Sequence, residues 1–298
     1  MKKRLLNLFA PIIDLKNAIY YRSFTVKYPY EIKNTSDTID YIVKNKVSVS
    51  RYGDGEFGVM NGSCNGFQTK NEKLGERLRE VIESPINGHI LCIPYALTSL
   101  AHMNKRSARW WRYFLKHHKE WITSVTPINQ QYFDASFTRF YIDLRDKKAS
   151  SNYIERIKRI WYNRDVYIIE GAFTRLGINN DLLDGASSVH RILCPSRDAY
   201  SKYEEILYSA KNNIPKGKNV LILLALGMTA TVLAYDLHKE GFQAIDIGHI
   251  DVEYCWLNMG AKEKCYIEGK AVNEVNSSDF CTDLDNKEYT NSIIDRII

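Results

Sequence analysis

Short runs of consecutive apolar residues alternate along the chain with longer segments in which apolar residues recur every three or four positions. A continuous apolar run is typical of a strand buried on both faces, and the longer spacing is typical of an amphipathic helix. The runs predict strands at 47–53, 89–95, 134–142, 165–171, 189–195, 219–226 and 243–248. The spaced segments predict helices at 71–84, 107–122, 153–163, 197–211 and 229–241, the last capped by Gly241.

Strands that alternate with helices in this way predict an α/β fold, Rossmann-like, with a mostly parallel sheet and helices on both faces. Ligands of such folds bind beyond the C-terminal ends of the strands, so residues that follow a strand are the first candidates for chemistry. No internal repeat or Gly/Pro/Ser linker interrupts the series, but the periodicity fades near residue 260. We therefore divide the chain into a basic, amphipathic segment at 1–40, an α/β domain at 41–260 and an extension at 261–298.

Composition changes this picture little. The chain has 298 residues and a net charge of +6, which suits an anionic partner without identifying one. No basic run with interleaved aromatic residues and no zinc-finger spacing occurs, so a nucleic-acid partner is not expected. The six cysteines form no CxxC pair. They are expected to be buried thiols in a reducing compartment rather than a disulfide framework or a zinc site.

The N-terminus begins with basic residues and a short apolar stretch that Asn7, Pro11 and Asp14 interrupt. Because no small-residue cleavage site follows, a signal peptide is not expected, whereas a basic amphipathic helix on an anionic membrane surface fits the pattern. The longest apolar window, 220–235, contains a glycine in its middle and reads as a strand followed by a helix, not as a membrane span. We expect a cytoplasmic protein, with peripheral contact at the cytoplasmic face of the membrane.

The stretch "RYGDGE" follows the first predicted strand and offers the clearest chemistry. Gly53 and Gly55 permit a sharp turn, which would let Asp54 and Glu56 project toward one point. Two converging carboxylates repel each other unless a cation lies between them. Hard oxygen ligands of this kind suit Mn²⁺ or Mg²⁺, whose coordination shell substrate phosphates would complete. Arg51 would present its planar guanidinium to a phosphate. The alternative is an ordinary tight turn in which Asp54 bonds to its own backbone and Glu56 and Arg51 form a surface pair.

Two further segments follow predicted strands. Gly227 would turn the chain into a helix that Thr229 caps, and the free N–H groups at the start of that helix would form an anion site. The alternative is an ordinary strand-to-helix turn in the core. In "HIDVE", an extended backbone would put His249, Asp251 and Glu253 on one face. There they could supply a general base or further metal ligands, or they could form a solvated strand edge.

Polar residues after the strand at 165–171 form another candidate binding patch. Glu170, Arg175 and the Asn-Asn-Asp cluster at 179–181 could hold a sugar or phosphate, with a helix cap at Asn180 or Asp181 as the alternative. Aromatic residues could also stack on sugars, but three tryptophans lie at helical spacing and are expected in the core: Trp110, Trp111 and Trp121.

Several blocks in fixed order give these residues a context. "RYGDGEF", "FTRLGINNDLLD", "HRILCPSRDAY", "LALGMTATVLAYDL" and "AIDIGHIDVEY" resemble a bacterial glycosyltransferase family of GT-D fold, formerly catalogued as a domain of unknown function. The resemblance extends from about Tyr41 to Trp256 and implies a metal-dependent transferase that uses a UDP-sugar donor. The family's acid-x-acid metal motif falls on Asp54 and Glu56. The chain departs from the family pattern at Met228, where relatives carry proline, and at Ala172, where relatives carry a second acid.

The resemblance implies transfer of a hexose from a UDP-sugar to a cell-surface polysaccharide or a glycoprotein glycan. In this interpretation Asp54 and Glu56 hold Mn²⁺ or Mg²⁺, while the donor contacts Arg51, Gly53, Gly55, Gly227, Thr229 and Arg175. The catalytic candidates are Asp251, Glu253 and His249, with the two acids favoured as the base. Two alternatives remain: a metal-dependent phosphoesterase that uses water, and a nucleotide-binding module without turnover.

Overall fold

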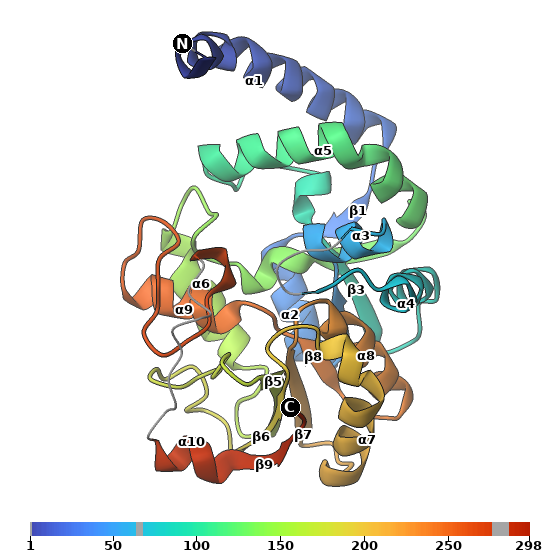
Figure 1. Ribbon diagram of the computed structural model, residues 1–298, viewed down its shortest axis with the longest axis vertical. Helices are drawn as coiled ribbons and strands as arrows, with labels where there is room; N and C mark the ends of the chain where they lie inside the picture. The colour runs from blue at the N-terminus through green and yellow to red at the C-terminus, as the bar shows by residue number, and fades with distance from the viewer. Residues whose placement is uncertain (1, 64–67, 276–285) are drawn as a thin grey trace.

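Nine parallel strands run through the centre of the computed structural model, which describes residues 2–63, 68–275 and 286–298 (Figure 1). They form one sheet in the order β1-β4-β3-β2-β8-β7-β5-β6-β9, and each of their pairings is parallel. The strands are β1 Glu31–Lys33, β2 Ser48–Arg51, β3 His89–Ile93, β4 Gln131–Asp134, β5 Asp165–Gly171, β6 Ser188–Cys194, β7 Val220–Ala225, β8 Ala244–Asp246 and β9 Ile293–Arg296. The predicted fold class is confirmed.

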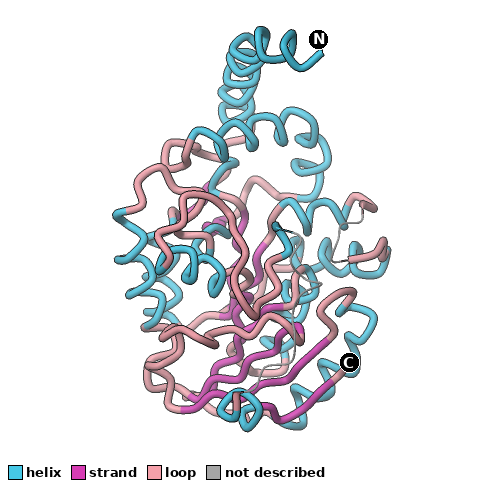
Figure 2. The backbone as a smooth tube through the Cα atoms, turned by 60° about the vertical axis from the view of Figure 1, so that its left-hand side comes forward, coloured by secondary structure: helices cyan, strands magenta, loops and turns pink. Residues whose placement is uncertain are grey.

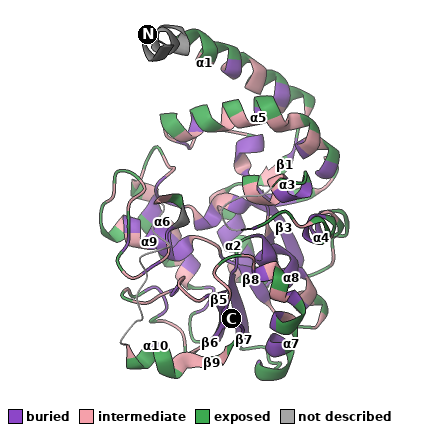
Figure 3. Cartoon of the chain, viewed as in Figure 1, coloured by how far each residue is buried: buried purple, intermediate pink, exposed green. Residues whose placement is uncertain are grey.

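Helices cover both faces of this sheet, which explains the continuous apolar runs. Ile222 and Leu224 of β7 pack into one apolar cluster, and their neighbours Leu221 and Leu223 pack into another on the opposite face. Figure 2 shows the strands enclosed by helices and loops, and Figure 3 shows their burial. The helices are α1 Lys2–Lys27, α2 Thr35–Asn45, α3 Asp54–Met60, α4 Glu72–Glu83, α5 Lys105–Val125, α6 Lys148–Lys158, α7 Tyr203–Asn213, α8 Met228–Lys239, α9 Ile250–Asn258 and α10 Lys287–Ser292.

Most predicted elements are present within a few residues of their predicted bounds, but two segments that were predicted to be extended are not. The strand predicted at 134–142 ends at Asp134, where a 3₁₀ turn follows at Ala135–Thr138. The extended backbone expected at 249–253 is instead the start of α9. In both segments apolar and polar residues alternate over a short stretch, and such a stretch fits a helical turn as well as a strand. Cys64 and Cys281 lie outside the described residues, and the other four cysteines are free thiols.

The order of the strands decides which loops meet. β2, β3 and β4 lead away from the centre in one direction, whereas β7, β5 and β6 lie on the other side. β8 lies between β2 and β7, so the C-terminal ends of β2 and β8 are neighbours although they are far apart in sequence. The edge strands β1 and β9 come from near the two ends of the chain, so both terminal segments contribute to the sheet.

The turn at Gly227 provides a test of the local backbone. Gly227 adopts φ 55° and ψ −140°, a conformation open only to glycine, and nothing lies within 4 Å of a Cβ placed there. Gly227→Ala should therefore lower the free energy of unfolding by about 1–3 kcal/mol through backbone strain alone. Urea denaturation would measure this change. Gly58→Ala, inside α3 with its nearest contact at 3.7 Å, should be close to neutral, and an equal loss in both variants would contradict the explanation.

Candidate active site

A buried ion pair joins β2 to β8 at the C-terminal edge of the sheet. Arg51 Nη2 donates to Asp246 Oδ1 at 2.9 Å, and its Nε donates to the Asp246 carbonyl, also at 2.9 Å. Its Nη1 donates to Thr138 Oγ1 at 2.8 Å and to the Ala135 carbonyl at 3.2 Å. The guanidinium packs so closely on Gly248 that a Cβ there would lie 1.8 Å from Nη2. Arg51 therefore fixes three loops at one point.

This arrangement corrects the expected role of Arg51. A guanidinium has five N–H donors, and the four hydrogen bonds to Asp246, Thr138 and Ala135 use four of them. Its planar guanidinium thus faces the protein, and one N–H donor is left for a ligand phosphate. Arg51 is better described as the group that orients Asp246 and supplies a fixed positive charge beneath the site.

Asp54 and Glu56 lie in a helix, not in an open turn. α3 begins at Asp54, and the Glu56 carboxylate folds back to accept from the Gly53 N–H at 2.7 Å. Gly53 has an extended backbone with φ −126°, and Gly55 lies within the helix, so the sharp glycine turn that was expected here is wrong. The value of Gly53 lies in its missing side chain, because a Cβ there would lie 3.3 Å from Glu56 Oε2.

The two acids of the motif consequently differ in environment. Residues two apart in a helix point about 200° apart, so the side chains do not share a direction by helical geometry. Asp54 is exposed at the first turn of α3. Glu56 is partly buried and faces Asp246: burial first, and then the Asp246 charge, raise the pKa of Glu56 to about 7 against the opposing effects of the Gly53 N–H and Arg51. Burial also raises the pKa of Asp246.

The donor set around Glu56 fits a divalent cation. The pKa values of Glu56 and Asp246 are both raised, and the charge of Asp246 contributes to the rise at Glu56, so a bound cation would relieve that repulsion. Within the described ranges, no group of three or more His, Cys, Asp or Glu side chains is arranged as a closed metal cage. Mg²⁺ and Mn²⁺ fit such an open set, since Mg²⁺ in particular takes one or two carboxylates and completes its shell with water and phosphate.

Asp251 and Glu253 belong to the first turn of α9, where both are buried in structural contacts. Asp251 forms an ion pair with Lys270 Nζ at 2.5 Å and accepts from the Gly177 N–H at 2.9 Å and from Asn180 Nδ2 at 2.8 Å. Glu253 Oε2 accepts from the backbone N–H groups of residues 141 and 142 at 3.0 and 2.9 Å. The extended face that was expected to join these acids to His249 does not exist, and both acids stabilise loops instead.

Glu253 makes a prediction about pH. Burial, as the largest cause, raises the pKa of Glu253 to about 7, so the folded protein retains a proton that the unfolded chain releases near its ordinary value of 4.5. The stabilising contribution is therefore complete below pH 4.5 and is lost as the pH rises through 7. Glu253→Gln cannot ionise, so its unfolding free energy relative to wild type should rise by about 1–3 kcal/mol between pH 5 and pH 8. Urea titrations at both pH values would measure it.

Glu263→Gln, at an exposed position in the following loop, is the matched control for Glu253. Its difference from the wild type should be the same at both pH values. If the Glu253→Gln difference is also constant with pH, the carboxyl group is ionised throughout this range and the explanation is wrong.

His249 is the one predicted catalytic candidate that lies among the charged groups of this edge. It precedes α9 directly after Gly248. Burial first, and then the cations Arg139 and Arg51, lower the pKa of His249 to about 4, while Glu274 opposes them. Arg139 donates to Glu274 at 2.7 Å, which brings a loop from the last part of the chain beside the site. His249 is thus a neutral imidazole at neutral pH, able to accept a proton.

The remaining predicted donor contacts have mixed outcomes. Gly227 forms the turn before α8 as expected, but the helix starts at Met228 and Thr229 does not cap it. The Thr229 side chain is fully buried, and its hydroxyl has no hydrogen-bond partner among the described residues. Arg175 is buried and donates to the Gly269 carbonyl at 2.7 Å, and Glu170 is paired with Arg191 at 2.5 Å. Arg175 and Glu170 therefore stabilise the loop after β5.

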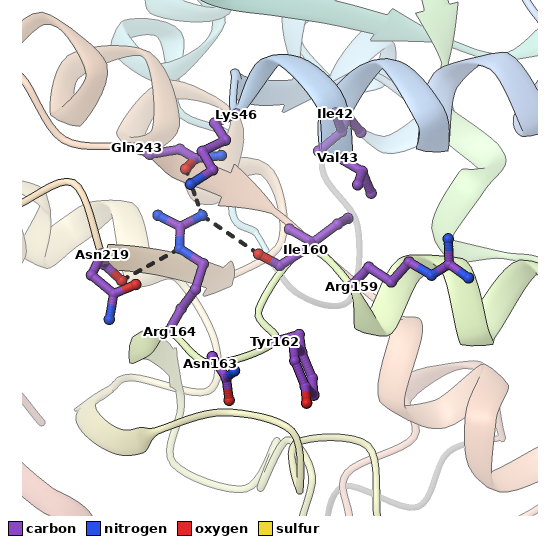
Figure 4. A pocket seen from close by; sticks show the side chains of 10 residues that line it. All are labelled: Ile42, Val43, Lys46, Arg159, Ile160, Tyr162, Asn163, Arg164, Asn219 and Gln243. Carbon is purple, nitrogen blue, oxygen red and sulfur yellow. Dashed lines mark hydrogen bonds between the residues drawn. The ribbon is translucent and has the colours of Figure 1, made fainter.

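A hollow of about 300 Å³ lies at the opposite, N-terminal edge of the sheet (Figure 4). Its floor contains Arg164, which donates to Gln243 Oε1 at 2.7 Å and to the carbonyls of Asn219 and Val220 at 3.3 and 2.7 Å. These bonds join the segments at the N-terminal ends of β5, β7 and β8. Because it faces away from the loops that follow the strands, this hollow is separate from the candidate active site.

Asp246 is the residue that the sequence analysis missed. It lies within the predicted strand at 243–248 and is the last residue of β8, and a charged residue in an otherwise apolar "AID" run was a usable signal. What the sequence alone lacked was its neighbour, because only the pairing of β8 with β2 brings Asp246 beside Arg51 and Glu56.

Comparison with known proteins agrees with this geometry. A family model described as "Glycosyltransferase GT-D fold" matches residues 49–275. The chain is 36% identical over 265 residues to "Probable glycosyl transferase Gly" of Streptococcus gordonii, covering 88% of this chain and 38% of that protein. It is 34% identical over 271 residues to "Glycosyltransferase GlyD" of Streptococcus pneumoniae serotype 4, covering 90% of this chain and 33% of that protein. The chain thus spans only 33–38% of the length of these curated relatives.

Solved structures match over nearly their whole length. One, described as a highly conserved domain of unknown function with a distinct glycosyltransferase fold, superposes with a TM-score of 0.86 at 37% identity, covering 93% of this chain and 99% of that one. Another, described as a new glycosyltransferase from Streptococcus sanguinis, also gives a TM-score of 0.86, at 35% identity, covering 90% of this chain and all of that one. The similarity therefore includes the sheet edge that carries Arg51, Glu56 and Asp246.

Proposed function

The chain belongs to the glycosyltransferase GT-D fold family, and from this membership we propose that it transfers a hexose from a UDP-sugar to a glycan hydroxyl. The acceptor class we propose is a cell-surface polysaccharide or the glycan of a glycoprotein, and the cofactor is Mn²⁺ or Mg²⁺. The observation that carries the proposal is the junction of β2 and β8, where Arg51 pairs with Asp246 at 2.9 Å and the charge of Asp246 acts on Glu56 at the start of α3. It coincides with the position of the acid-x-acid motif.

The proposed role of these residues is to hold the diphosphate end of the donor. Glu56, with Asp54 at the same helix start, would hold the divalent ion, which supplies charge to stabilise the departing diphosphate. Arg51 fixes Asp246 through one hydrogen bond to its carboxylate and one to its backbone carbonyl, so the charge pattern of the site is set before a ligand binds. A preorganised charge pattern of this kind does not need to reorganise during the reaction, and electrostatic stabilisation is then most effective.

The start of α8 supports a donor on the same edge. Gly227 turns the chain from β7 into a helix of 12 residues, so the backbone N–H groups at the helix start face the edge on which strands β7 and β8 end. A helix start attracts anionic groups through these N–H groups and the helix dipole. We propose that it contributes to phosphate binding.

The acceptor hydroxyl must lose a proton as it attacks the anomeric carbon. We propose His249 as the group that takes this proton, because it is uncharged near neutral pH and lies beside Arg51 and Arg139. Asp251 and Glu253, the acids favoured from sequence, are held in buried contacts with other loops. The proton would leave the hydroxyl for an imidazole nitrogen while the diphosphate leaves with the electron pair of the broken bond.

A donor screen tests the proposal directly. The purified chain is incubated with a panel of UDP-hexoses, a glycan acceptor and Mn²⁺ or Mg²⁺, and release of UDP is followed with and without EDTA. We expect metal-dependent UDP release that requires the acceptor. Equal release without acceptor would instead indicate a phosphoesterase or hydrolase, and UDP binding without turnover of any donor would indicate a binding module.

A further inference from the structure

The N-terminal helix α1 lies at one end of the molecule, beside α5 (Figure 1). Its inner face is well packed: Asn17 and Phe24 are each 3% exposed, and the Tyr21 hydroxyl donates to the Ala96 carbonyl at 2.9 Å. Asp14 pairs with Arg109 of α5 at 2.7 Å. The helix is therefore fixed against α5 in a defined orientation, and its outer face is presented to the surroundings.

The outer face of α1 carries a stripe of large apolar residues. Ile12, Leu15, Ile19 and Val26 lie at intervals of three, four and seven positions, which places them on one side of a helix. They are 52%, 62%, 63% and 76% exposed. We call these four residues the outer stripe. Single exposed apolar residues are common, but four in line on a projecting helix indicate a surface that is covered in the working state.

Cations flank the outer stripe. Lys16 and Lys27 lie on one side of it and Arg22 on the other, all three exposed, and Asp14, the acid in α1, is used by Arg109. An apolar stripe bordered by lysine and arginine is the pattern of a helix that lies in the plane of an anionic membrane surface.

The neighbouring helix α5 adds a second basic and aromatic surface. Trp110, which was expected in the core, is 43% exposed, and Tyr113 next to it is 54% exposed. Arg109 and Lys116 are exposed on the same helix. Tryptophan and tyrosine with an apolar body and a polar edge favour the headgroup region of a bilayer, and arginine and lysine favour anionic lipid.

We propose that α1, through its outer stripe and the flanking cations, binds the surface of an anionic lipid bilayer. No helix in the part of the chain that the structure describes is long and apolar enough to cross a membrane, so the contact is peripheral. The positive flanks favour lipid over a second copy of the same helix, because two identical faces would bring Lys16, Arg22 and Lys27 against their own copies. The proposal does not depend on the transfer activity.

Vesicle co-sedimentation tests this proposal with the whole chain. We expect binding to vesicles of phosphatidylcholine mixed with phosphatidylglycerol, and much weaker binding to phosphatidylcholine alone. Raising the ionic strength from about 0.1 M to about 1 M, which shortens the Debye length from about 10 Å to about 3 Å, should release much of the bound protein. Leu15→Gln/Ile19→Gln should lower the partition constant at least about tenfold, and Lys16→Gln and Arg22→Gln about fivefold each.

Matched substitutions elsewhere separate this surface from a general effect of composition. Tyr208→Gln, at a 72% exposed apolar position on α7, and Lys218→Gln, at an exposed lysine, should bind vesicles as the wild type does. Equal binding to both vesicle types, or no effect of Leu15→Gln/Ile19→Gln, would overturn the proposal. So would light scattering that shows an oligomer without lipid which the same double substitution dissociates, because the stripe would then bind a second copy.

Discussion

Glu56→Gln is expected to lower the rate of transfer from a UDP-sugar donor by about 10²–10³-fold while leaving the fold intact. Glutamine has the same size as glutamate and keeps an oxygen that can accept the hydrogen bond from the Gly53 N–H, which is 2.7 Å long in the wild type. We therefore expect α3 to form in the variant. It removes the charge that faces Asp246 and with it the attraction for a divalent ion. Rates of UDP release at several Mn²⁺ concentrations, together with Mn²⁺ titration calorimetry, would measure both effects.

Two comparisons make the Glu56 result specific. Asp54→Ala should reduce transfer strongly as well, whereas Glu83→Gln, at the exposed end of α4, should retain wild-type rates and Mn²⁺ affinity. Circular dichroism should show the same helix content in all three variants. Wild-type activity of Glu56→Gln or of Asp54→Ala, or undiminished activity of the wild type in excess EDTA, would mean that these acids do not bind a metal needed for transfer.

Lys270→Met is expected to lower the free energy of unfolding by about 3–5 kcal/mol. Lys270 and Asp251 are 2% exposed each, and their 2.5 Å contact is the ion pair that holds the segment after α9 against the start of that helix. Methionine retains most of the side-chain volume but leaves the Asp251 carboxylate buried with only the Gly177 N–H and Asn180 as donors. The cost is therefore that of an unpaired buried charge, measured by urea denaturation.

An exposed ion pair is the matched control. Lys211 contacts Glu240 at 2.7 Å on the surface, with side chains 43% and 37% exposed, so Lys211→Met should change stability by less than about 1 kcal/mol.

Urea denaturation of Asp251→Asn, together with its transfer rate, separates a structural role of Asp251 from a role as the catalytic base. If Asp251→Asn is as stable as the wild type but loses transfer, Asp251 is the base after all, and His249 is not.

Much of the fold follows from local patterns in the sequence. The runs at 165–171 and 219–226 predicted β5 and β7 nearly to the residue, because a strand buried on both faces must be apolar throughout. The glycines at 227 and 241 likewise predicted the start and the end of α8. The short helix α3 was missed because its two glycines and two acids match a turn equally well, and tertiary contacts decide between the two.

The candidate site depended less on local pattern. The sequence by itself determined that arginine and carboxylates stand at strand ends, and strand ends of a parallel sheet share one edge. Only the tertiary structure decided which of them meet: β8 inserts beside β2, so Glu56 faces Asp246, while Asp251 and Glu253 rotate with α9 into the interior. The physical reason is the sequence separation of the interacting residues. Periodicity reflects contacts within one helix or strand, whereas the charges around a carboxylate come from a strand that is distant in sequence and packs beside it.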